Sequence, residues 1–321
     1  MLKSFHLYNG SLDALPDTST GSARALLITT LNAHSYNVAC KDAAFAEALK
    51  GSDVLLADGV SVVWAARLLR RVNSQQSRKR NVEILHQQSR VKSQESRAKS
   101  QESRVKTLKK IAGEDLFYWE MRRLQSTVNS QQSSDNRLQS SVISHQSSVN
   151  SQQANSPKRP KVFFLGSTEE VLAKIKERAG VEFPNVEVHT FSPPYKPEFT
   201  EEDNGAMYAA IHAVQPDVLF VGMTAPKQEK WAYALMKNEK WKIKNENETI
   251  NYKLPTNCHV CCIGAVFDFY AGTVQRAPLW MIKLGLEWFY RLVKEPRRMW
   301  RRYLIGNVRF VWTILKEAVS S

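Results

Sequence analysis

One carboxylate of this chain stands where it could act as a base. Asp58 directly follows the apolar run DVLLA (53–57) and precedes Gly59. A carboxyl group at the end of a buried run is partly desolvated, which raises its pKa and suits it to general-base chemistry. The alternative is that Asp58 caps a helix beginning at Val60, and the spacing alone favours the cap modestly.

Two further polar residues end another apolar run. Thr30 and Asn32 follow ALLIT (25–29) and carry a hydroxyl and an amide two positions apart. Residues at that spacing point to the same side of an extended chain, so both could reach one ligand. A cap or a turn role is equally common for these residue types.

The string GMTAPKQEKW (222–231) is a more specific signal. Pro226 suits the first turn of a helix, and the residues after it lie where helix N–H groups can face a ligand. Lys227 could meet a phosphate there, and Gln228 could hydrogen-bond a sugar or a base. An ordinary helix start explains Pro226 and Glu229 but leaves the full string unexplained.

The C-terminal segment, residues 276–321, is basic and aromatic. It holds ten Lys/Arg and three Glu, a net charge of +7. Arg291, Arg298 and Arg301 are spaced by seven and three, so one helical face could present all three, unless Pro296 breaks the helix. Arginines of this kind clamp phosphate, and with Trp and Tyr they suit a membrane interface. A solvated helix packed through its aromatics, or nucleic-acid binding, would use the same residue types.

Neither the cysteines nor the carboxylates indicate a metal site. Three of the four cysteines crowd into CHVCC (258–262), where neighbours on a strand point to opposite faces, and zinc needs four ligands. Buried core cysteines are therefore the favoured interpretation. The chain also has no Asp-x-Asp, the usual carboxylate pair for a metal bound to a nucleotide sugar, so we expect no metal and no other cofactor.

Strands and helices must position the candidate residues, and their pattern indicates a parallel sheet. Apolar runs alternate with helical patterns, which is typical of a Rossmann-like α/β fold covered by helices on both faces. Ligands of such sheets bind at the carboxyl ends of the strands, where the candidate residues stand. The predicted strands are 25–29, 53–57, 161–165, 186–191, 217–221 and 259–263.

Two low-complexity segments interrupt this pattern. Residues 73–106 repeat a seven-residue unit and carry nine Lys/Arg and three Glu, a net +6, and residues 125–157 are rich in Ser, Gln and Asn. Such segments bury too little apolar surface to offset the entropy of ordering, so we predict disordered insertions. The predicted domains are an α/β catalytic domain (1–277), interrupted by these insertions, and a C-terminal membrane or active-site appendage (278–321).

Composition restricts the class of protein. The 321 residues are 43% hydrophobic, which excludes fully disordered and collagen-like chains. Of the net charge of +14, the two basic segments supply +6 and +7, which leaves +1 for the rest. No run of 18 apolar residues and no apolar N-terminal stretch occurs. We expect a cytoplasmic protein without a membrane span.

The motifs together resemble a known family. The chain is similar to the WecG/TagA/CpsF glycosyltransferases, which make bacterial surface polysaccharides and wall teichoic acids. The match covers nearly all of the chain outside the insertions. The most specific strings are APKQE and the C-terminal string of residues 287–303. In chain order, the matching strings are TLN (30–32), ADG (57–59), AGEDL (112–116), FFLGS (163–167), PDVLFVGM and APKQE (within 216–229), IGAVFDFYAG (263–272), QRAP (275–278) and EWFYRLVKEPRRMWRRY (287–303).

The resemblance implies an activity and a set of site residues. It implies an inverting, metal-independent transfer of N-acetylmannosamine, its uronate or a related N-acetylhexosamine from UDP to an undecaprenyl-diphosphate-linked sugar. It places the protein peripherally on the cytoplasmic membrane face, with no nucleic-acid partner and a possible homo-oligomer. The family's base matches Asp58, its polar pocket matches Thr30, Asn32 and Gln228, and its C-terminal arginines match Arg291, Arg298 and Arg301.

Two other classes of protein share some of these features. A dinucleotide-dependent oxidoreductase fits the sheet pattern, but TTLNAHS (29–35) stands where its G-x-G-x-x-G would be. A basic, non-enzymatic module that binds membranes or nucleic acid is supported only by net charge, much of which lies in the low-complexity repeat.

Overall fold

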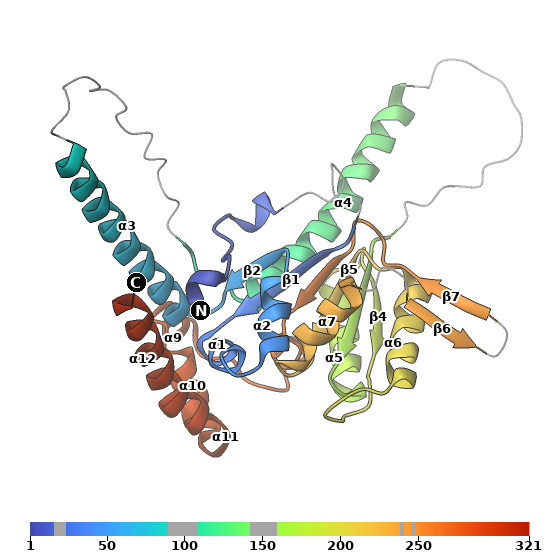
Figure 1. Cartoon of the computed structure of the whole chain (residues 1–321). Coiled ribbons are helices and arrows are strands. Elements are labelled where there is room, and N and C mark those ends of the chain that lie inside the picture. The colour runs from blue at the N-terminus through green and yellow to red at the C-terminus, as the bar shows by residue number, and fades with distance from the viewer. Residues whose placement is uncertain (16–23, 89–107, 142–158, 238–240, 246–247, 321) are drawn as a thin grey trace, which may run out of the picture. The chain divides into compact units, whose positions relative to one another are not determined.

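A computed structural model describes residues 1–15, 24–88, 108–141, 159–237, 241–245 and 248–320. Its centre is a six-stranded parallel sheet with the strand order β2-β1-β8-β5-β3-β4 (Figure 1). The predicted Rossmann-like α/β class is therefore confirmed, and each predicted strand exists. The strands are β1 (Leu26–Leu31), β2 (Val54–Ala57), β3 (Lys161–Gly166), β4 (Glu187–Phe191), β5 (Val218–Gly222) and β8 (His259–Cys262).

The inner strands are buried along their whole apolar runs. Every residue of β1 and β8 is buried, as are the first four residues of β5. Strands that alternate in burial would have one wet face, so continuous burial means that both faces are covered. Strands β1 and β8 pair in parallel, with Leu26 opposite His259 and Ile28 opposite Cys261.

Helices and one hairpin follow these strands in the chain. Several begin at a side-chain cap: Asp42 accepts from the Phe45 N–H at 3.0 Å, and Thr200 and Asp203 form a capping box. The helices are α1 (Ala33–Ala39), α2 (Ala43–Lys50), α3 (Val60–Gln88), α4 (Gly113–Ser141), α5 (Glu169–Glu182), α6 (Glu201–Val214), α7 (Lys227–Lys237), α8 (Val266–Tyr270), α9 (Leu279–Lys283), α10 (Glu287–Lys294), α11 (Pro296–Trp300) and α12 (Gly306–Val319), with short 3-10 turns η1 (Leu2–Ser4) and η2 (Leu12–Ala14) and a π-helical turn η3 (Arg301–Ile305). The hairpin strands are β6 (Trp241–Asn245) and β7 (Glu248–Tyr252).

The chain forms two compact units. Unit 1 comprises residues 1–15, 30–112 and 277–321, and unit 2 comprises residues 16–29 and 113–276. The C-terminal helices thus share a unit with the carboxyl end of β1, with β2 and with the helices that follow them. This division differs from the predicted one, in which residues 278–321 form an appendage to a domain of residues 1–277.

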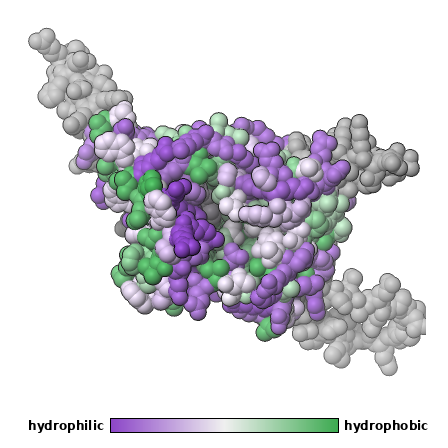
Figure 2. Space-filling model, turned by 90° about the horizontal axis from the view of Figure 1, so that it is seen from below, coloured by the Kyte–Doolittle hydropathy of each residue, from purple (hydrophilic) through white to green (hydrophobic). Residues whose placement is uncertain are grey.

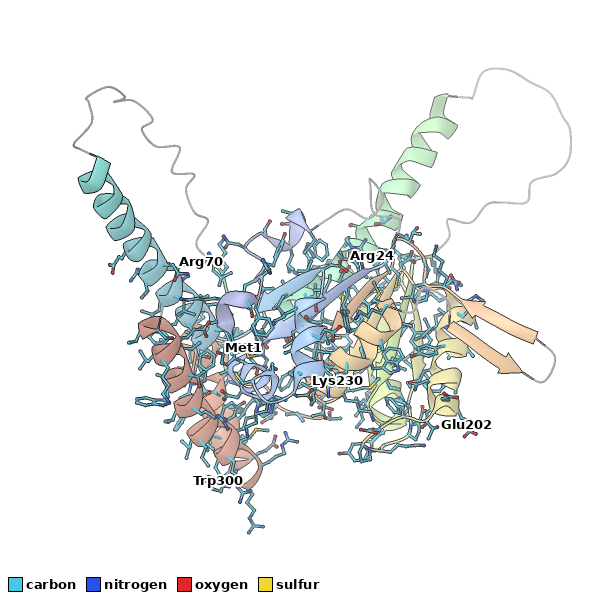
Figure 3. The ribbon with its side chains drawn as sticks, viewed as in Figure 1. Met1, Arg24, Arg70, Glu202, Lys230 and Trp300 are labelled. Atoms are coloured by element: carbon cyan, nitrogen blue, oxygen red, sulfur yellow. The ribbon has the colours of Figure 1, made fainter. Side chains whose placement is uncertain are left out.

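Helix α12 is held within unit 1 by buried contacts. Phe310 is fully buried and meets the Tyr36 ring of α1 edge-on, with ring centroids 5.1 Å apart. The Asn37 Nδ2 donates to the Gly306 carbonyl at 2.7 Å. The ammonium group of Met1, labelled in Figure 3, donates to Glu317 Oε1 at 2.7 Å. These contacts make α12 part of the packing of unit 1.

The low-complexity segments are helical where the structure describes them. Residues 73–88 continue α3, and residues 125–141 continue α4. Neither stretch contains Gly or Pro, and Gln, Arg and Lys are good helix formers, so a helix begun by packing can run on. Residues 89–107 and 142–158 lie outside the described residues, so the disorder expected of 89–106 and 142–157 stays a prediction, whereas 73–88 and 125–141 are helical.

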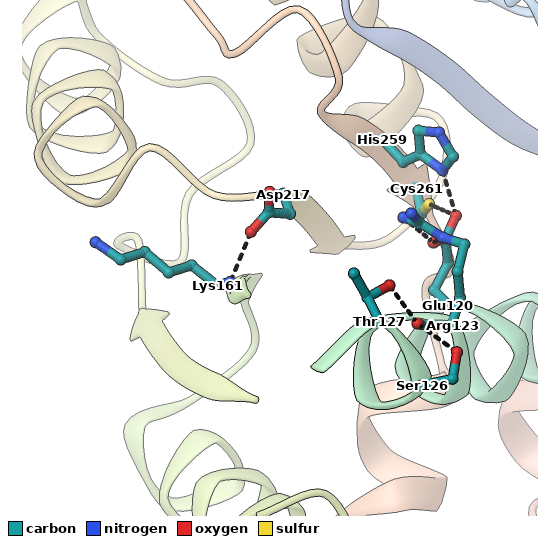
Figure 4. A network of polar contacts seen from close by, with 8 residues as sticks. All are labelled: Glu120, Arg123, Ser126, Thr127, Lys161, Asp217, His259 and Cys261. Atoms are coloured by element: carbon teal, nitrogen blue, oxygen red, sulfur yellow. Dashed lines mark hydrogen bonds and ion pairs between the residues drawn. The ribbon is translucent and has the colours of Figure 1, made fainter. Parts of the chain in front are cut away.

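A buried polar network joins α4 to the sheet within unit 2 (Figure 4). Glu120 is fully buried, and its Oε1 lies 2.6 Å from His259 Nδ1 at the start of β8. Its Oε2 accepts from Arg123 Nε at 2.9 Å. The Cys261 thiol also faces this carboxylate, with Sγ 4.0 Å from Oε1. Burial raises the pKa of Cys261 well above its ordinary value, so the thiol is neutral.

The cysteines of the CHVCC string are core residues, as the sequence favoured. Cys258, Cys261 and Cys262 are all fully buried. They occupy the central strand β8 and the position just before it, where they fill space between the sheet and its helices.

Candidate functional site

The carboxyl ends of β1 and β2 lie side by side in unit 1. The Asp58 N–H, just after β2, donates to the Leu31 carbonyl at the end of β1 at 2.9 Å. This bond places Asp58 next to the residues that flank Leu31, namely Thr30 and Asn32. The structure therefore brings three predicted site residues together at one edge of the sheet.

The turn after β2 puts Asp58 one residue away from a helix-cap position. Helix α3 begins at Val60, and the Gly59 carbonyl accepts from the Val63 N–H at 3.4 Å, so Gly59 fills the cap position. Gly59 has φ +114°, a conformation that favours glycine. The half-buried Asp58 thus precedes the turn, which weakens the interpretation of Asp58 as the cap of α3.

Asn32 does cap a helix. Its Oδ1 accepts from the Ser35 N–H at 3.0 Å and lies 3.3 Å from Ser35 Oγ. This structural role was the alternative that the sequence left open, and it engages the oxygen of the amide. Thr30 is 8% exposed in β1. Direct contact of Thr30 and Asn32 with a ligand stays a prediction.

The sequence analysis missed an arginine that lies near Asp58. Arg302, in the π-helical turn η3, is half-buried, and its Nε is buried without a hydrogen-bond partner among the described residues. Burial lowers the pKa of Arg302, and Arg291 and Arg298 lower it further, whereas Asp58 favours the charged guanidinium. Arg302 thus lies within electrostatic reach of Asp58 and of two predicted arginines of unit 1, Arg291 and Arg298, the latter of which also pairs with Glu295 at 2.6 Å.

His34 belongs to the same group of residues. It lies in the first turn of α1, two residues after Asn32. Burial and the nearby Arg302 lower the pKa of His34 to about 4, so the imidazole is neutral at neutral pH. The sequence analysis did not select His34, because the seven histidines are scattered along the chain. Its position two residues after the TLN string was the one signal that could have found it.

Arg301 is placed differently from the other predicted arginines. Its side chain is exposed, and its guanidinium carbon lies 5.2 Å from the centroid of the Trp300 ring. The spacing argument assumed one helix, but α10 ends at Lys294 and α11 restarts at Pro296. The break and the π-helical turn interrupt this helical face, and Arg302 lies within electrostatic reach of Asp58. A ligand contact by Arg301 stays a prediction.

On the activity that the resemblance implies, we expect Arg302→Ala to lower turnover with a lipid-diphosphate acceptor more than Arg301→Ala does. A charge-assisted bond to phosphate contributes about 1.5–3 kcal/mol, so the loss is roughly 10- to 100-fold. The measurement is kcat/KM for both variants, and the neighbouring arginine is a control of equal charge change. An equal effect of the two substitutions would contradict the special position of Arg302.

Gln228 lies in unit 2, at the start of α7, and both ends of its amide are engaged. Its Oε1 accepts from the Met223 N–H at 3.1 Å, and its Nε2 donates to Glu229 Oε1 at 2.8 Å. The side chain is only 4% exposed. Gly264 packs against the amide: a Cβ at this position would lie 3.6 Å from both Oε1 and Nε2 of Gln228.

Lys227 is held by the segment that follows β4. Its Nζ donates to the Lys196 carbonyl and lies 3.4 Å from the centroid of the Phe199 ring. Burial lowers the pKa of Lys227. The predicted phosphate contact of Lys227 stays a prediction.

Comparison with known proteins identifies the family. The model of the glycosyl transferase WecG/TagA/CpsF family matches residues 8–98 and 148–321. The chain belongs to this family. All eight predicted site residues lie in the matched ranges, and so do Arg302 and His34.

Two relatives of this WecG/TagA/CpsF chain carry the same name. An N-acetylglucosaminyldiphosphoundecaprenol N-acetyl-beta-D-mannosaminyltransferase of Bacillus subtilis is 29% identical over 292 residues, which are 91% of this chain and 79% of that protein. The protein of this name from Bacillus spizizenii is 30% identical over 164 residues, which are 51% of this chain and 55% of that protein. The resemblance seen in the motifs is confirmed, and the WecG/TagA/CpsF chain is a glycosyltransferase.

Proposed function

We propose that the chain transfers N-acetylmannosamine, its uronate or a related N-acetylhexosamine from UDP to an undecaprenyl-diphosphate-linked N-acetylglucosamine, with inversion, in the synthesis of a surface polysaccharide or teichoic acid. The observation that carries the proposal is that the partly buried Arg302 lies within electrostatic reach of Asp58, Arg291 and Arg298 in unit 1. A base beside cations is what a sugar transfer to a diphosphate-bearing acceptor requires. The names of the relatives supply the acceptor and the sugar.

Asp58 acts as the base in this mechanism. Its carboxylate takes the proton of the acceptor hydroxyl while the hydroxyl oxygen attacks the anomeric carbon of the donor. The bond from that carbon to the diphosphate breaks on the opposite face, and UDP leaves with the electron pair. One displacement inverts the anomeric configuration.

The arginines neutralise phosphate in this mechanism. Arg302 is partly desolvated, so its charge acts in a medium where a bond to phosphate is stronger than in water. Arg291 and Arg298 add charge nearby. We propose that these cations remove the need for a metal, and activity unchanged by EDTA is the expected result. Gln228 and Lys227 remain the proposed donor contacts of unit 2.

A direct product assay tests the activity. The protein is incubated with a panel of UDP-sugars and a short-chain lipid-diphosphate N-acetylglucosamine, and the product is identified by mass. We expect one added N-acetylhexosamine or its uronate and release of UDP, with the inverted anomer visible by NMR. Transfer of no sugar, or retention at the anomeric carbon, would contradict the proposal.

We further propose that the C-terminal helices hold the enzyme on a membrane surface. Within the described ranges, no helix has the length and apolar composition needed to cross a bilayer. Figure 2 shows deep purple and green residues next to one another in the left part of the molecule, where these helices lie. Large exposed apolar side chains of this region include Leu279, Trp280, Leu284, Trp288, Phe289, Val293, Trp300, Leu304, Ile305, Val308, Trp312 and Val319. Aromatic residues among cations suit the headgroup region.

We expect the double variant Trp280→Ser, Trp312→Ser to bind anionic vesicles at least about 10-fold more weakly, because each exposed ring buries apolar area in the membrane. Both side chains are 60% exposed, so the fold should not suffer. Vesicle co-sedimentation measures the binding, which should also weaken as salt rises. Tyr195→Ser is the control, since this exposed aromatic residue lies in unit 2. Equal binding by the double variant would exclude the tryptophans as anchors.

A further inference from the structure

The side chain of Glu229 is a buried acid that the proposed mechanism does not use. It is 1% exposed in the first turn of α7. Its Oε1 accepts from Gln228 Nε2 at 2.8 Å. Its Oε2 is buried and has no hydrogen-bond partner among the described residues. A buried carboxyl group with one oxygen unpaired is costly, so its presence beside a proposed ligand residue calls for a reason.

The surroundings of Glu229 favour its neutral form. Burial raises the pKa of Glu229 to about 7. Cys262 of β8 faces it, and burial keeps this thiol neutral by raising its pKa well above the ordinary value. The neighbouring strand β5 presents only the apolar residues 218–221 and Gly222. The described groups around Glu229 thus offer its carboxylate no counter-charge.

Glu229 and the Met223 N–H together decide which way the Gln228 amide points. An amide side chain has a donating end and an accepting end, which can exchange by a flip. The Met223 N–H requires the oxygen on its side, and Glu229 Oε1 requires the nitrogen on the other. The second N–H of Nε2 then has one fixed direction.

We propose that Glu229 is a positioning residue that fixes the Gln228 amide, so that one N–H of Nε2 is held ready for an acceptor atom of the UDP-sugar donor. This inference rests on the proposed role of Gln228 in donor binding. Glu229 acts through Gln228 and does not touch the donor. It follows that the two residues act as one unit in binding.

A double-mutant cycle with UDP as the probe tests this coupling. We expect Gln228→Ala and Glu229→Ala each to raise the Kd for UDP by about 5- to 10-fold, the effect of one lost hydrogen bond. The double variant should bind no more weakly than Gln228→Ala, because the second change removes nothing further. Additive effects, or wild-type affinity in Glu229→Ala, would overturn the inference.

A pH series with Glu229→Gln covers the case in which Glu229→Ala does not fold. Ionisation of wild-type Glu229 adds a buried negative charge that opposes an anionic ligand, so the Kd for UDP should rise as the pH increases through about 7. Glu229→Gln keeps an accepting oxygen but cannot ionise. The titration of UDP itself affects both proteins equally, so it cancels in the ratio of the wild-type Kd to the Kd of Glu229→Gln. A pH-independent ratio would overturn the inference.

The outcomes separate this inference from the proposed function. Wild-type UDP affinity in Gln228→Ala would remove Gln228 from donor binding, and the inference would fall with it. A Gln228→Ala defect without coupling to Glu229 would leave Gln228 in its role and reject Glu229 alone. Coupling between the two residues, together with loss of the pH dependence in Glu229→Gln, supports the inference.

Discussion

We expect Asp58→Asn to lower turnover by about 100- to 10,000-fold while UDP still binds. This is the usual range for loss of a general base. Asparagine keeps the size of the side chain and its hydrogen-bonding oxygen, but it cannot accept the proton of the acceptor hydroxyl. The measurement is kcat in a direct product assay, beside the Kd for UDP from calorimetry.

The position of Asp58 makes this variant informative. The residue is fixed through its backbone N–H to Leu31 at 2.9 Å, which the substitution leaves intact. Asp53→Asn, an exposed aspartate at the start of the same apolar run, is the matched control and should keep full turnover. Near-full turnover of Asp58→Asn would remove Asp58 from the role of base. Asp58 would then be structural, and its substitution should lower the free energy of unfolding by roughly 1 kcal/mol.

The second large effect concerns stability. We expect Glu120→Ala to lower the free energy of unfolding by about 1–3 kcal/mol, the usual cost of leaving a buried polar group without its hydrogen-bond partner. Glu120 is fully buried and bridges His259 and Arg123, so its loss leaves the buried His259 ring without this partner. Urea unfolding of the two proteins at the same pH measures the difference.

An exposed glutamate provides the control for this prediction. Glu170 on α5 pairs with Lys174 at 2.7 Å, but its side chain is 77% exposed. Glu170→Ala should change the free energy of unfolding by less than about 1 kcal/mol, because exposed ion pairs contribute little. A similar small loss in Glu120→Ala would show that the buried network of Figure 4 is not a main support of α4.

The sequence by itself determined the parallel sheet and the residues at the ends of its strands. Runs such as 54–57 and 218–221 are apolar throughout, and only a strand covered on both faces needs such a run. The position of Asp58 directly after one of them therefore followed from local pattern. The string APKQE also marked the start of α7, because proline and the residues after it carry a local signal.

Tertiary structure alone decided which side chains meet. Glu120 and His259 lie 139 residues apart, and their pairing depends on how α4 packs against β8. Long-range contacts of this kind leave no periodic trace in the sequence.

The arginines show the same division. Spacing within an assumed single helix selected Arg291, Arg298 and Arg301. The interruption between α10 and α11 and the turn η3 bring Arg302 near Asp58 and leave Arg301 against Trp300. A helical face is predictable only while the helix continues, because one break rotates every residue beyond it. The sequence thus determined that the C-terminal segment is rich in arginine, and the fold determined that Arg302 lies within electrostatic reach of the proposed base.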